Sequence, residues 1–181
     1  MQRADQEIIS LLQDESTREK GFDQLVKAYQ QEIYWLIRRM VIDHDDADDL
    51  TQETFVKIWK NLDGFRGDST LFTWIYRIAT NEALAHLRKK RVTFRFLSPE
   101  VKPSTAIPEY NDAFYRSDDA MRQFQKALAE LPDKQRLVFH MKYYDDLTYE
   151  QISEITGTSV GALKATYHHA AKKIQKKLFP E

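Results

Sequence analysis

The sequence predicts an all-α protein in which a flexible linker joins two small helical domains, the C-terminal one a helix-turn-helix. Apolar residues recur at helical spacing in every strongly periodic segment, and no segment shows the alternation of a strand. A stretch that holds three of the five prolines among Ser, Thr and Glu lacks any period and is typical of a linker. All three tryptophans precede it. We therefore expect domains at 1–91 and 118–181, with the linker at 92–117.

The composition is that of a globular protein. The chain has 181 residues, 42% hydrophobic and 30% charged, which supplies enough apolar side chains for a core. It has no cysteine, which excludes disulfides and thiolate metal sites and fits a reducing compartment. The sequence MQRADQEIIS lacks the apolar core of a signal peptide, and no apolar run approaches membrane-spanning length. We therefore expect a cytoplasmic protein without a membrane span.

Three helices are predicted before the linker. Residues 22–41 and about 46–61 carry apolar side chains at helical spacing, and the second segment has acids in its first turn, where the helix dipole favours them. Gly64 and Gly67 mark the turn that follows. The third helix, about 70–91, ends in basic residues that suit its negative C-terminal pole.

Three further helices are predicted from the linker to the turn at Gly157. Two of them cover about 118–131 and 133–144. Thr148 and Gln151 form a capping box that starts the third, a short helix. Gly157 ends this helix, because glycine adopts a left-handed turn at little cost.

The last predicted helix is basic and begins after Thr158 or Ser159. A short helix, a glycine-containing turn and a basic second helix make a helix-turn-helix, which inserts the start of its second helix in the DNA major groove. The residues expected near base edges or phosphates are Ser159, Gly161, Lys164, Ala165 and His168. The alternative is an ordinary helical hairpin with a solvated lysine face, which the lysine run alone would favour. The cap, the glycine turn and the absence of acids from 164–177 together favour DNA binding. A metal site at His168 and His169 is disfavoured, because adjacent helical residues point about 100° apart.

The net charge of −1 hides a segregated distribution. Residues 43–53 hold six acids and no lysine or arginine, whereas 77–95 and 164–177 are strongly basic. Such segregation suggests at least two partners of opposite charge. The acidic run lacks the glycine and the closing glutamate of a calcium-binding loop. A solvated helix start and a docking face for a basic partner are both compatible with this run, and the run alone favours the first.

The stretch FRGDSTLFTWIYR, residues 65–77, places aromatic rings beside a basic helix. Duplex DNA does not require exposed rings, but the bases of single-stranded DNA stack on them, with about 1–3 kcal/mol per base. The alternative is that the rings belong to the core, and the residues alone favour neither interpretation. The side chains expected in the core are Phe72, Trp74 and Ile75, and the rings expected to be exposed are Phe65 and Tyr76.

The order of these parts resembles one protein family. DADDLTQETFVKIWKNLDGF is followed by FRGDSTLFTWIYRIATNEALAHLRKKR, by the linker, and by LAELPDKQRLVFHMKYYDDLTYEQISEITGTSVGALKA. Over roughly 20–178 the chain resembles the alternative sigma factors of bacteria, specifically the extracytoplasmic-function (ECF) group of the sigma-70 family. The resemblance implies sigma region 2 at 1–91 and region 4 at 118–181, without a region 1 extension or a region 3 domain.

The resemblance also implies a role for each charged surface. The acidic helix is expected to bind the clamp helices of the largest core RNA polymerase subunit through Asp48, Asp49, Gln52, Glu53, Phe55 and Trp59. The next loop and helix are expected to hold a base flipped from the −10 element and to recognise that element through Phe65, Arg66, Gly67, Asp68, Ser69, Arg77, Asn81, Arg88, Lys89 and Arg91. The residues expected at the −35 element are Ser159, Val160, Gly161, Lys164, Ala165, Tyr167, His168 and Lys172. Family members usually have arginines where this chain has Thr166, His169 and Ala171, which leaves the −35 contacts open.

The implied partners are core RNA polymerase, including the flap of its second-largest subunit, promoter DNA in duplex and single-stranded form, and an anti-sigma factor. No enzymatic activity, cofactor or metal is expected, since neither a glycine-rich phosphate loop nor a nucleophile–base pair is evident. A stand-alone helix-turn-helix regulator is the first alternative, but it needs no acidic docking helix and usually dimerises. An anti-sigma or adaptor protein is the second, and the two basic helices argue against it.

Overall fold

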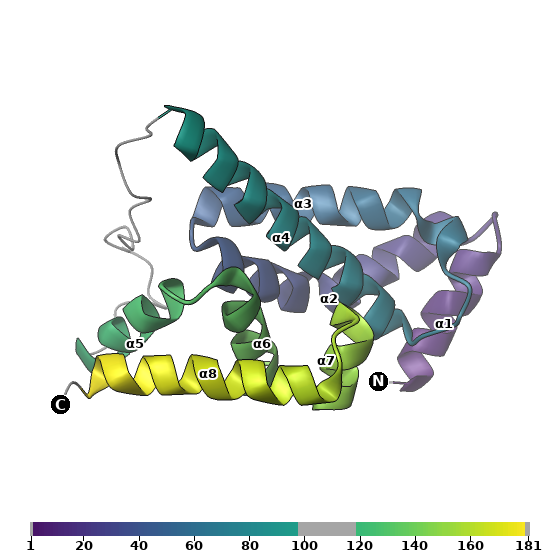
Figure 1. Ribbon diagram of the computed structural model, residues 1–181. Helices are drawn as coiled ribbons and strands as arrows, with labels where there is room; N and C mark the ends of the chain where they lie inside the picture. The colour runs from purple at the N-terminus through teal and green to yellow at the C-terminus, as the bar shows by residue number, and fades with distance from the viewer. Residues whose placement is uncertain (1, 98–118, 180–181) are drawn as a thin grey trace.

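The computed structural model describes residues 2–97 and 119–179, and in these ranges every regular element is helical (Figure 1). The elements are α1 (Gln2–Gln13), α2 (Arg18–Val41), α3 (His44–Lys60), the 3-10 turn η1 (Leu62–Gly64), α4 (Leu71–Leu97), α5 (Asp119–Ala129), α6 (Asp133–Tyr143), α7 (Tyr149–Thr156) and α8 (Val160–Leu178). None of the helices in the described part of the chain combines the length and the apolar character that crossing a membrane requires. The predicted all-α architecture with two helical units is confirmed.

The N-terminal unit packs α1, α3 and α4 around the central helix α2, which contacts each of the other three. Figure 1 shows α4 running across α2 and α3. The apolar stripe predicted for residues 22–41 is the face by which α2 enters this core. Its fully buried side chains are Leu25, Ile33, Leu36, Ile37, Arg38 and Met40. The arginine in this set holds the end of the helix, as described below.

Helix α1 is a helix that the sequence analysis did not predict, and among its described side chains Ile8 and Leu12 are buried while Ile9 packs against the core in part. It lies very close to α2: a Cβ atom on Gly21 would be 2.9 Å from the backbone nitrogen of Leu12, so only glycine permits this approach. The hydroxyl of Tyr29 donates a hydrogen bond of 2.6 Å to the carboxylate of Asp5. Burial and this carboxylate raise the pKa of Tyr29.

The C-terminal unit, α5 to α8, contains the predicted helix-turn-helix. Thr148 accepts a hydrogen bond from the backbone amide of Gln151, whose side chain accepts one from the amide of Thr148, so the capping box is confirmed. Gly157 ends α7 with a φ of 70°, the left-handed conformation predicted for it. Ser159, and not Thr158, caps α8. Helix α8 packs against α5 and α6, where Leu128, Phe139, Ala170 and Ile174 form a small apolar cluster.

The two units also pack against each other. Helix α7 contacts α4, α6 contacts α2, and buried residues of both units form one continuous apolar cluster. Tyr76 is only 3% exposed, so the prediction of an exposed ring is wrong. Burial and the negative charge of Asp145, a residue of the C-terminal unit, raise the pKa of Tyr76. Of the other rings in this stretch, Phe65, Phe72 and Trp74 are half-buried.

Helix α4 is longer than the sequence predicts. It continues from Leu71 to Leu97, so the first residues of the linker expected at 92–117 are helical. The remainder of that expected linker, 98–117, lies outside the described residues.

Candidate nucleic-acid and protein interfaces

The acidic face of α3 carries most of the residues predicted to bind polymerase. Asp49, Gln52 and Glu53 are exposed and line a shallow groove of about 650 Å³. The other residues that line the groove are Val56, Lys57, Lys60 and Asn61, none of which the sequence analysis identified. Val56 is 52% exposed and Trp59, three residues further along α3, is 37% exposed, so two large apolar side chains reach the surface of this helix. An exposed apolar side chain within a charged rim is the anatomy of a protein-binding surface.

The remaining members of that predicted set differ in position. Trp59 is 37% exposed, and its ring meets the edge of Phe22 from α2 at a centroid distance of 4.9 Å. Phe55 is 8% exposed and lies in the core, where it anchors α3. Asp48 is half-buried. The accessible part of the predicted set is therefore Asp49, Gln52, Glu53 and, in part, Asp48 and Trp59.

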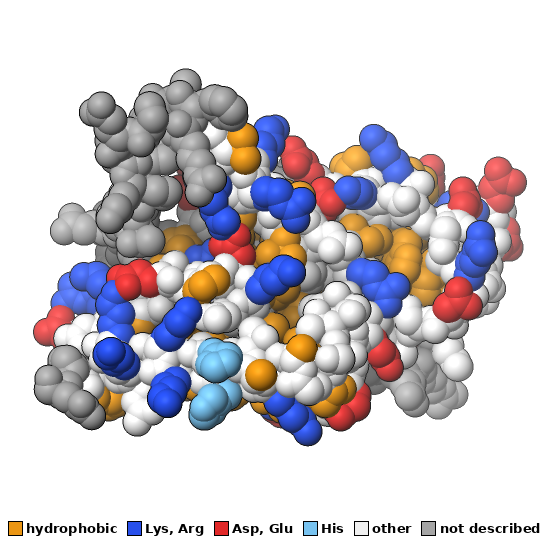
Figure 2. Space-filling view, viewed as in Figure 1, with side chains coloured by type: hydrophobic (Ala, Val, Ile, Leu, Met, Phe, Trp, Pro, Cys, Tyr) orange, Lys and Arg blue, Asp and Glu red, His pale blue; other side chains and the backbone are white. Residues whose placement is uncertain are grey.

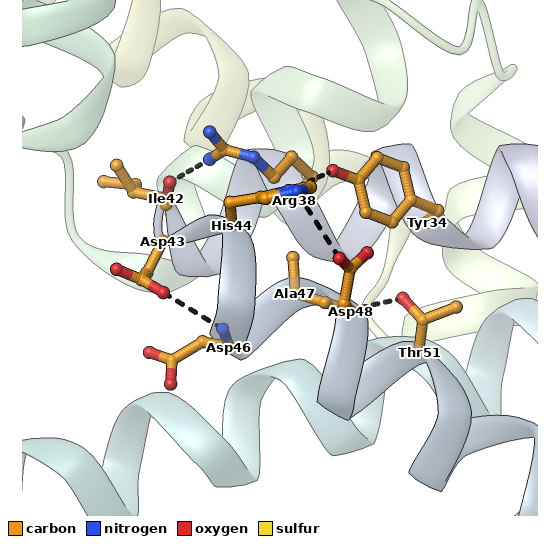
Figure 3. A network of polar contacts seen from close by, with 9 residues as sticks. All are labelled: Tyr34, Arg38, Ile42, Asp43, His44, Asp46, Ala47, Asp48 and Thr51. Atoms are coloured by element: carbon orange, nitrogen blue, oxygen red, sulfur yellow. Dashed lines mark hydrogen bonds and ion pairs between the residues drawn. The ribbon is translucent and has the colours of Figure 1, made fainter. Parts of the chain in front are cut away.

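A polar network at the α2–α3 corner fixes the start of α3 (Figure 3). Arg38, fully buried, donates a hydrogen bond to the backbone carbonyl of Ile42. Ile42 has a φ of 70°, a conformation that a β-branched residue adopts only when its surroundings hold it there. Asp43 then caps α3 by accepting a hydrogen bond of 3.0 Å from the amide of Asp46. This corner sets the direction in which α3 leaves α2.

The same corner orients one of the predicted docking residues. The Tyr34 hydroxyl lies 2.9 Å from Nδ1 of His44, and Nε2 of His44 lies 3.5 Å from the carboxylate of Asp48. Figure 3 shows this chain of contacts from α2 to the outer side of α3. Asp48 is thus held on the acidic side of α3 by a histidine that a tyrosine positions. Tyr34 and His44 are positioning residues that the sequence analysis did not identify, because the contact needs the α2–α3 turn to form first.

Helix α4 is tied to α3 by ion pairs. Lys90 and His86 both contact the carboxylate of Asp46, and Lys57 pairs with Glu82. Burial acts to raise the pKa of Asp46, but the contacts with Lys90 and His86 outweigh it and hold this pKa below its usual value. The acidic helix α3 and the basic helix α4 therefore belong to the same packed unit.

The loop between η1 and α4 contains the predicted base-binding residues. Arg66, Gly67 and Asp68 are exposed, and Gly67 has a φ of 77° that favours glycine. Ser69 and Phe65 are half-buried, and the Phe65 ring lies 5.4 Å from that of Trp74. A cavity of about 200 Å³ lies behind the loop and is lined by Ile9, Leu12, Gln13, Arg18, Leu62, Asp63, Phe65, Leu71 and Trp74. The tip of this loop is polar and exposed, and the aromatic rings of Phe65 and Trp74 lie beneath it.

The basic face of α4 agrees only in part with the prediction. Arg77, Asn81, Arg88 and Arg91 are exposed and recur at spacings that place them along one side of the helix, while Lys89 is exposed on another side. Two of these side chains are engaged by the C-terminal unit. Arg77 donates a hydrogen bond of 2.7 Å to the backbone carbonyl of Glu154, and Arg91 pairs with Asp133.

The outer face of α8 brings together most of the predicted −35 residues. Gly161, Lys164, Ala165, His168 and Lys172 are exposed at the i, i+3, i+4, i+7 and i+11 positions of one helix face. Figure 2 shows basic and histidine side chains gathered over this helix. The three other members of the predicted set serve the fold, since Ser159 caps the helix while Val160 and Tyr167 are half-buried. The Tyr167 ring stacks on Phe139 at 5.4 Å.

The adjacent histidines His168 and His169 on α8 have ring centroids 6.0 Å apart. Among the described residues, no group of three histidine, cysteine or acidic side chains could hold a metal ion. This pair therefore does not form a metal centre with other described residues.

Comparisons with known proteins identify the family of this chain. The Sigma-70 region 2 family matches residues 25–93, and the Sigma-70, region 4 family matches residues 121–174. The ECF RNA polymerase sigma factor SigW of Bacillus subtilis is 32% identical over 167 residues, covering 87% of this chain and 89% of that protein. The chain belongs to the ECF group of the sigma-70 family.

Two other proteins extend this match. The RNA polymerase sigma-H factor of Pseudomonas aeruginosa is 30% identical and covers 99% of this chain and 96% of its own length. Among solved structures, the sigma factor RpoE of Bartonella quintana, in complex with the anti-sigma factor NepR, has a TM-score of 0.73 at 28% identity. The match covers 88% of this chain and 97% of that one. This ECF sigma factor therefore directs RNA polymerase in transcription initiation, and the family matches and relatives described above support this function better than that of a stand-alone regulator.

Proposed function

We propose that this sigma factor binds core RNA polymerase through the acidic face of α3, opens the −10 element with the 65–69 loop and α4, and recognises the −35 element with α8. The observation that carries the proposal is the α3 groove, where Asp49, Gln52 and Glu53 surround the exposed Val56. The groove is acidic at Asp49 and Glu53 and basic at Lys57 and Lys60, so its acidic part suits basic side chains of a helical partner while Val56 adds apolar contact. The clamp helices of the largest polymerase subunit are the partner that we assign to this groove.

The two DNA elements are assigned by the chemistry of their surfaces. The α8 face offers lysines to phosphates and small residues, Gly161 and Ala165, that permit close approach to the major groove. The 65–69 loop offers Phe65, which lines a cavity, and the exposed carboxylate of Asp68, a pair that suits a single unstacked base. Strand opening is therefore assigned to region 2, and duplex recognition to region 4.

Further partners and properties complete the proposal. The polymerase flap is assigned to region 4, and an anti-sigma factor is assigned as the regulator because the RpoE relative was solved with one. We assign no catalytic activity to the chain itself, since the polymerase supplies the chemistry of RNA synthesis. The expected site of action is the cytoplasm, where core polymerase and promoter DNA are present.

The test is a charge reversal on the α3 face. Asp49→Lys combined with Glu53→Lys places like charge against a basic partner, so co-purification with core polymerase is expected to be lost. Both residues are exposed, so far-UV circular dichroism is expected to stay unchanged. The control is Glu19→Lys with Asp23→Lys, which makes the same change of net charge at exposed positions of α2. Wild-type co-purification of the α3 variant would exclude this face as the docking surface.

A further inference from the structure

The side of α4 that is assigned to the −10 element is occupied by the chain's own C-terminal unit. Arg77 donates a hydrogen bond of 2.7 Å to the carbonyl of Glu154, close to the end of α7. The hydroxyl of Thr73, itself 2% exposed, donates to the carboxylate of Glu154 at 3.5 Å. Tyr76, which lies between Thr73 and Arg77 in the sequence, is 3% exposed. With α7 packed on α4 at Arg77, a base or phosphate cannot occupy the same place beside this guanidinium.

A second contact holds the two units in this arrangement. Arg39 of α2 donates to the carboxylate of Asp145 at 2.6 Å, and the two side chains are only 16% and 13% exposed. The Arg39 guanidinium also lies 4.6 Å from the centre of the Tyr144 ring. His140 of α6 is also buried, and the positive charge of Arg39 helps to lower its pKa. A largely buried ion pair with an aromatic neighbour fixes one orientation of the two units, because either charge alone is costly to bury.

We propose that this side of α4 is a shared surface that binds either α7 of the same chain or single-stranded −10 DNA, and never both. The free sigma factor then adopts a self-packed arrangement, defined by α7 on α4 and by the Arg39–Asp145 pair. The inference rests on the proposed function of α4 in −10 recognition. DNA binding is weakened by the fraction of molecules in which the surface is covered, and loss of the ion pair relieves that competition.

Substitutions in the Arg39–Asp145 pair change the packing of the two units without changing any residue assigned to DNA. Neither residue belongs to the sets assigned to polymerase or promoter, and they are 106 positions apart in the chain. Arg39→Glu places two acids against each other and separates the units. It also makes the protein more acidic, which by charge alone weakens DNA binding. An increase in DNA binding by this variant therefore has to come from the uncovered surface.

The arrangement itself is measured in the full-length free chain by energy transfer between two dyes. The chain has no cysteine, so Gln30→Cys and Gln175→Cys, both at exposed helical positions, provide the only two thiols. We expect high transfer in the parent, lower transfer with Arg39→Glu or the milder Arg39→Gln, and recovery in the Arg39→Glu, Asp145→Arg double variant. Lys27→Glu, at an exposed position of α2, is the control for charge and is expected to leave transfer unchanged. Equal transfer in the parent and both Arg39 variants, with unchanged helical content, overturns the self-packed arrangement.

The competition is measured separately with a fluorescent pool of short random-sequence single-stranded DNA. Arg39→Glu is expected to bind the pool about tenfold more tightly than the parent chain, the double variant about as weakly as the parent, and Lys27→Glu no more tightly than the parent. If Arg39→Glu lowers energy transfer without tighter DNA binding, the shared surface is overturned although the units do pack. Polymerase co-purification reports on the α3 face independently, so its failure is distinguishable from either result.

Discussion

Replacing His140 by glutamine is expected to remove an acid-induced loss of stability. His140 lies on α6 with 3% exposure, faces Arg136 on its own helix and Arg39 on α2, and has the Tyr144 ring at 5.4 Å. Burial, reinforced by the two arginines, lowers the pKa of His140 to about 3 from its ordinary 6.5. The folded protein therefore keeps this imidazole neutral at a pH where the unfolded chain protonates it.

The size of the effect follows from linkage. Because the folded pKa is depressed, stability is complete above the ordinary pKa of 6.5 and falls as pH decreases toward about 3. Each pH unit inside this window costs about 1.4 kcal/mol, so lowering the pH from about 7.5 to about 5.5 should cost about 1.4 kcal/mol. Burial raises the pKa of Asp145, so its protonation makes the folded protein more stable as the pH falls. Asp145 is present in both wild type and His140→Gln, so this contribution cancels when the two proteins are compared.

The assay is urea unfolding followed by far-UV circular dichroism at the two pH values. Wild type should lose about 1.4 kcal/mol more than His140→Gln on acidification. His168→Gln, which replaces an exposed histidine on α8, should lose as much as wild type. An equal acid loss in wild type and His140→Gln would refute the claim that this buried imidazole resists protonation.

Three further predictions follow from the surfaces and caps. A Phe65→Ala, Asp68→Ala double variant in complex with polymerase should still bind duplex promoters but show reduced permanganate reactivity of promoter thymines. The reason is that contacts of the loop offset the few kcal/mol of lost base stacking only after a base has flipped. Unchanged reactivity would limit both residues to a structural role. Lys164→Ala with Lys172→Ala should weaken duplex binding about equally for all sequences and lower the salt slope by about one per lysine in titrations at two salt concentrations. An unchanged slope would place both lysines away from phosphates. Thr148→Ala should cost about 1 kcal/mol in urea unfolding, since the Gln151 amide loses its acceptor; an unchanged midpoint would contradict the capping role.

Local signals in the sequence are sufficient to predict most of the helices. The Thr148–Gln151 capping box and the left-handed Gly157 involve residues within one turn of each other, so their side-chain chemistry alone determines where α7 begins and ends. The apolar stripe of α2 likewise predicts its buried face. Helix α1 does have a helical period, since Ile8, Leu12 and the partly buried Ile9 pack on the core, so this short helix was predictable and the sequence analysis missed it.

The contacts that depend on chain topology could not be predicted. Tyr76 has the sequence context of an exposed ring, and it is buried where a unit far along the chain packs onto α4. The Arg39–Asp145 pair joins residues 106 positions apart, and no local pattern marks either of them. Similarly, the support that Tyr34 gives to His44 requires the left-handed turn at Ile42, a conformation that its β-branched side chain disfavours.

The most direct test of the proposed function is run-off transcription with purified core RNA polymerase on a library of promoter fragments. Wild-type protein is expected to produce transcripts that core polymerase alone does not make, from templates that share a −35 and a −10 element at fixed spacing. The Asp49→Lys, Glu53→Lys variant is expected to produce none of them, while Glu19→Lys, Asp23→Lys behaves as wild type. Wild-type protein that co-purifies with core polymerase yet adds no transcript from any template would contradict the assignment of promoter recognition to this chain.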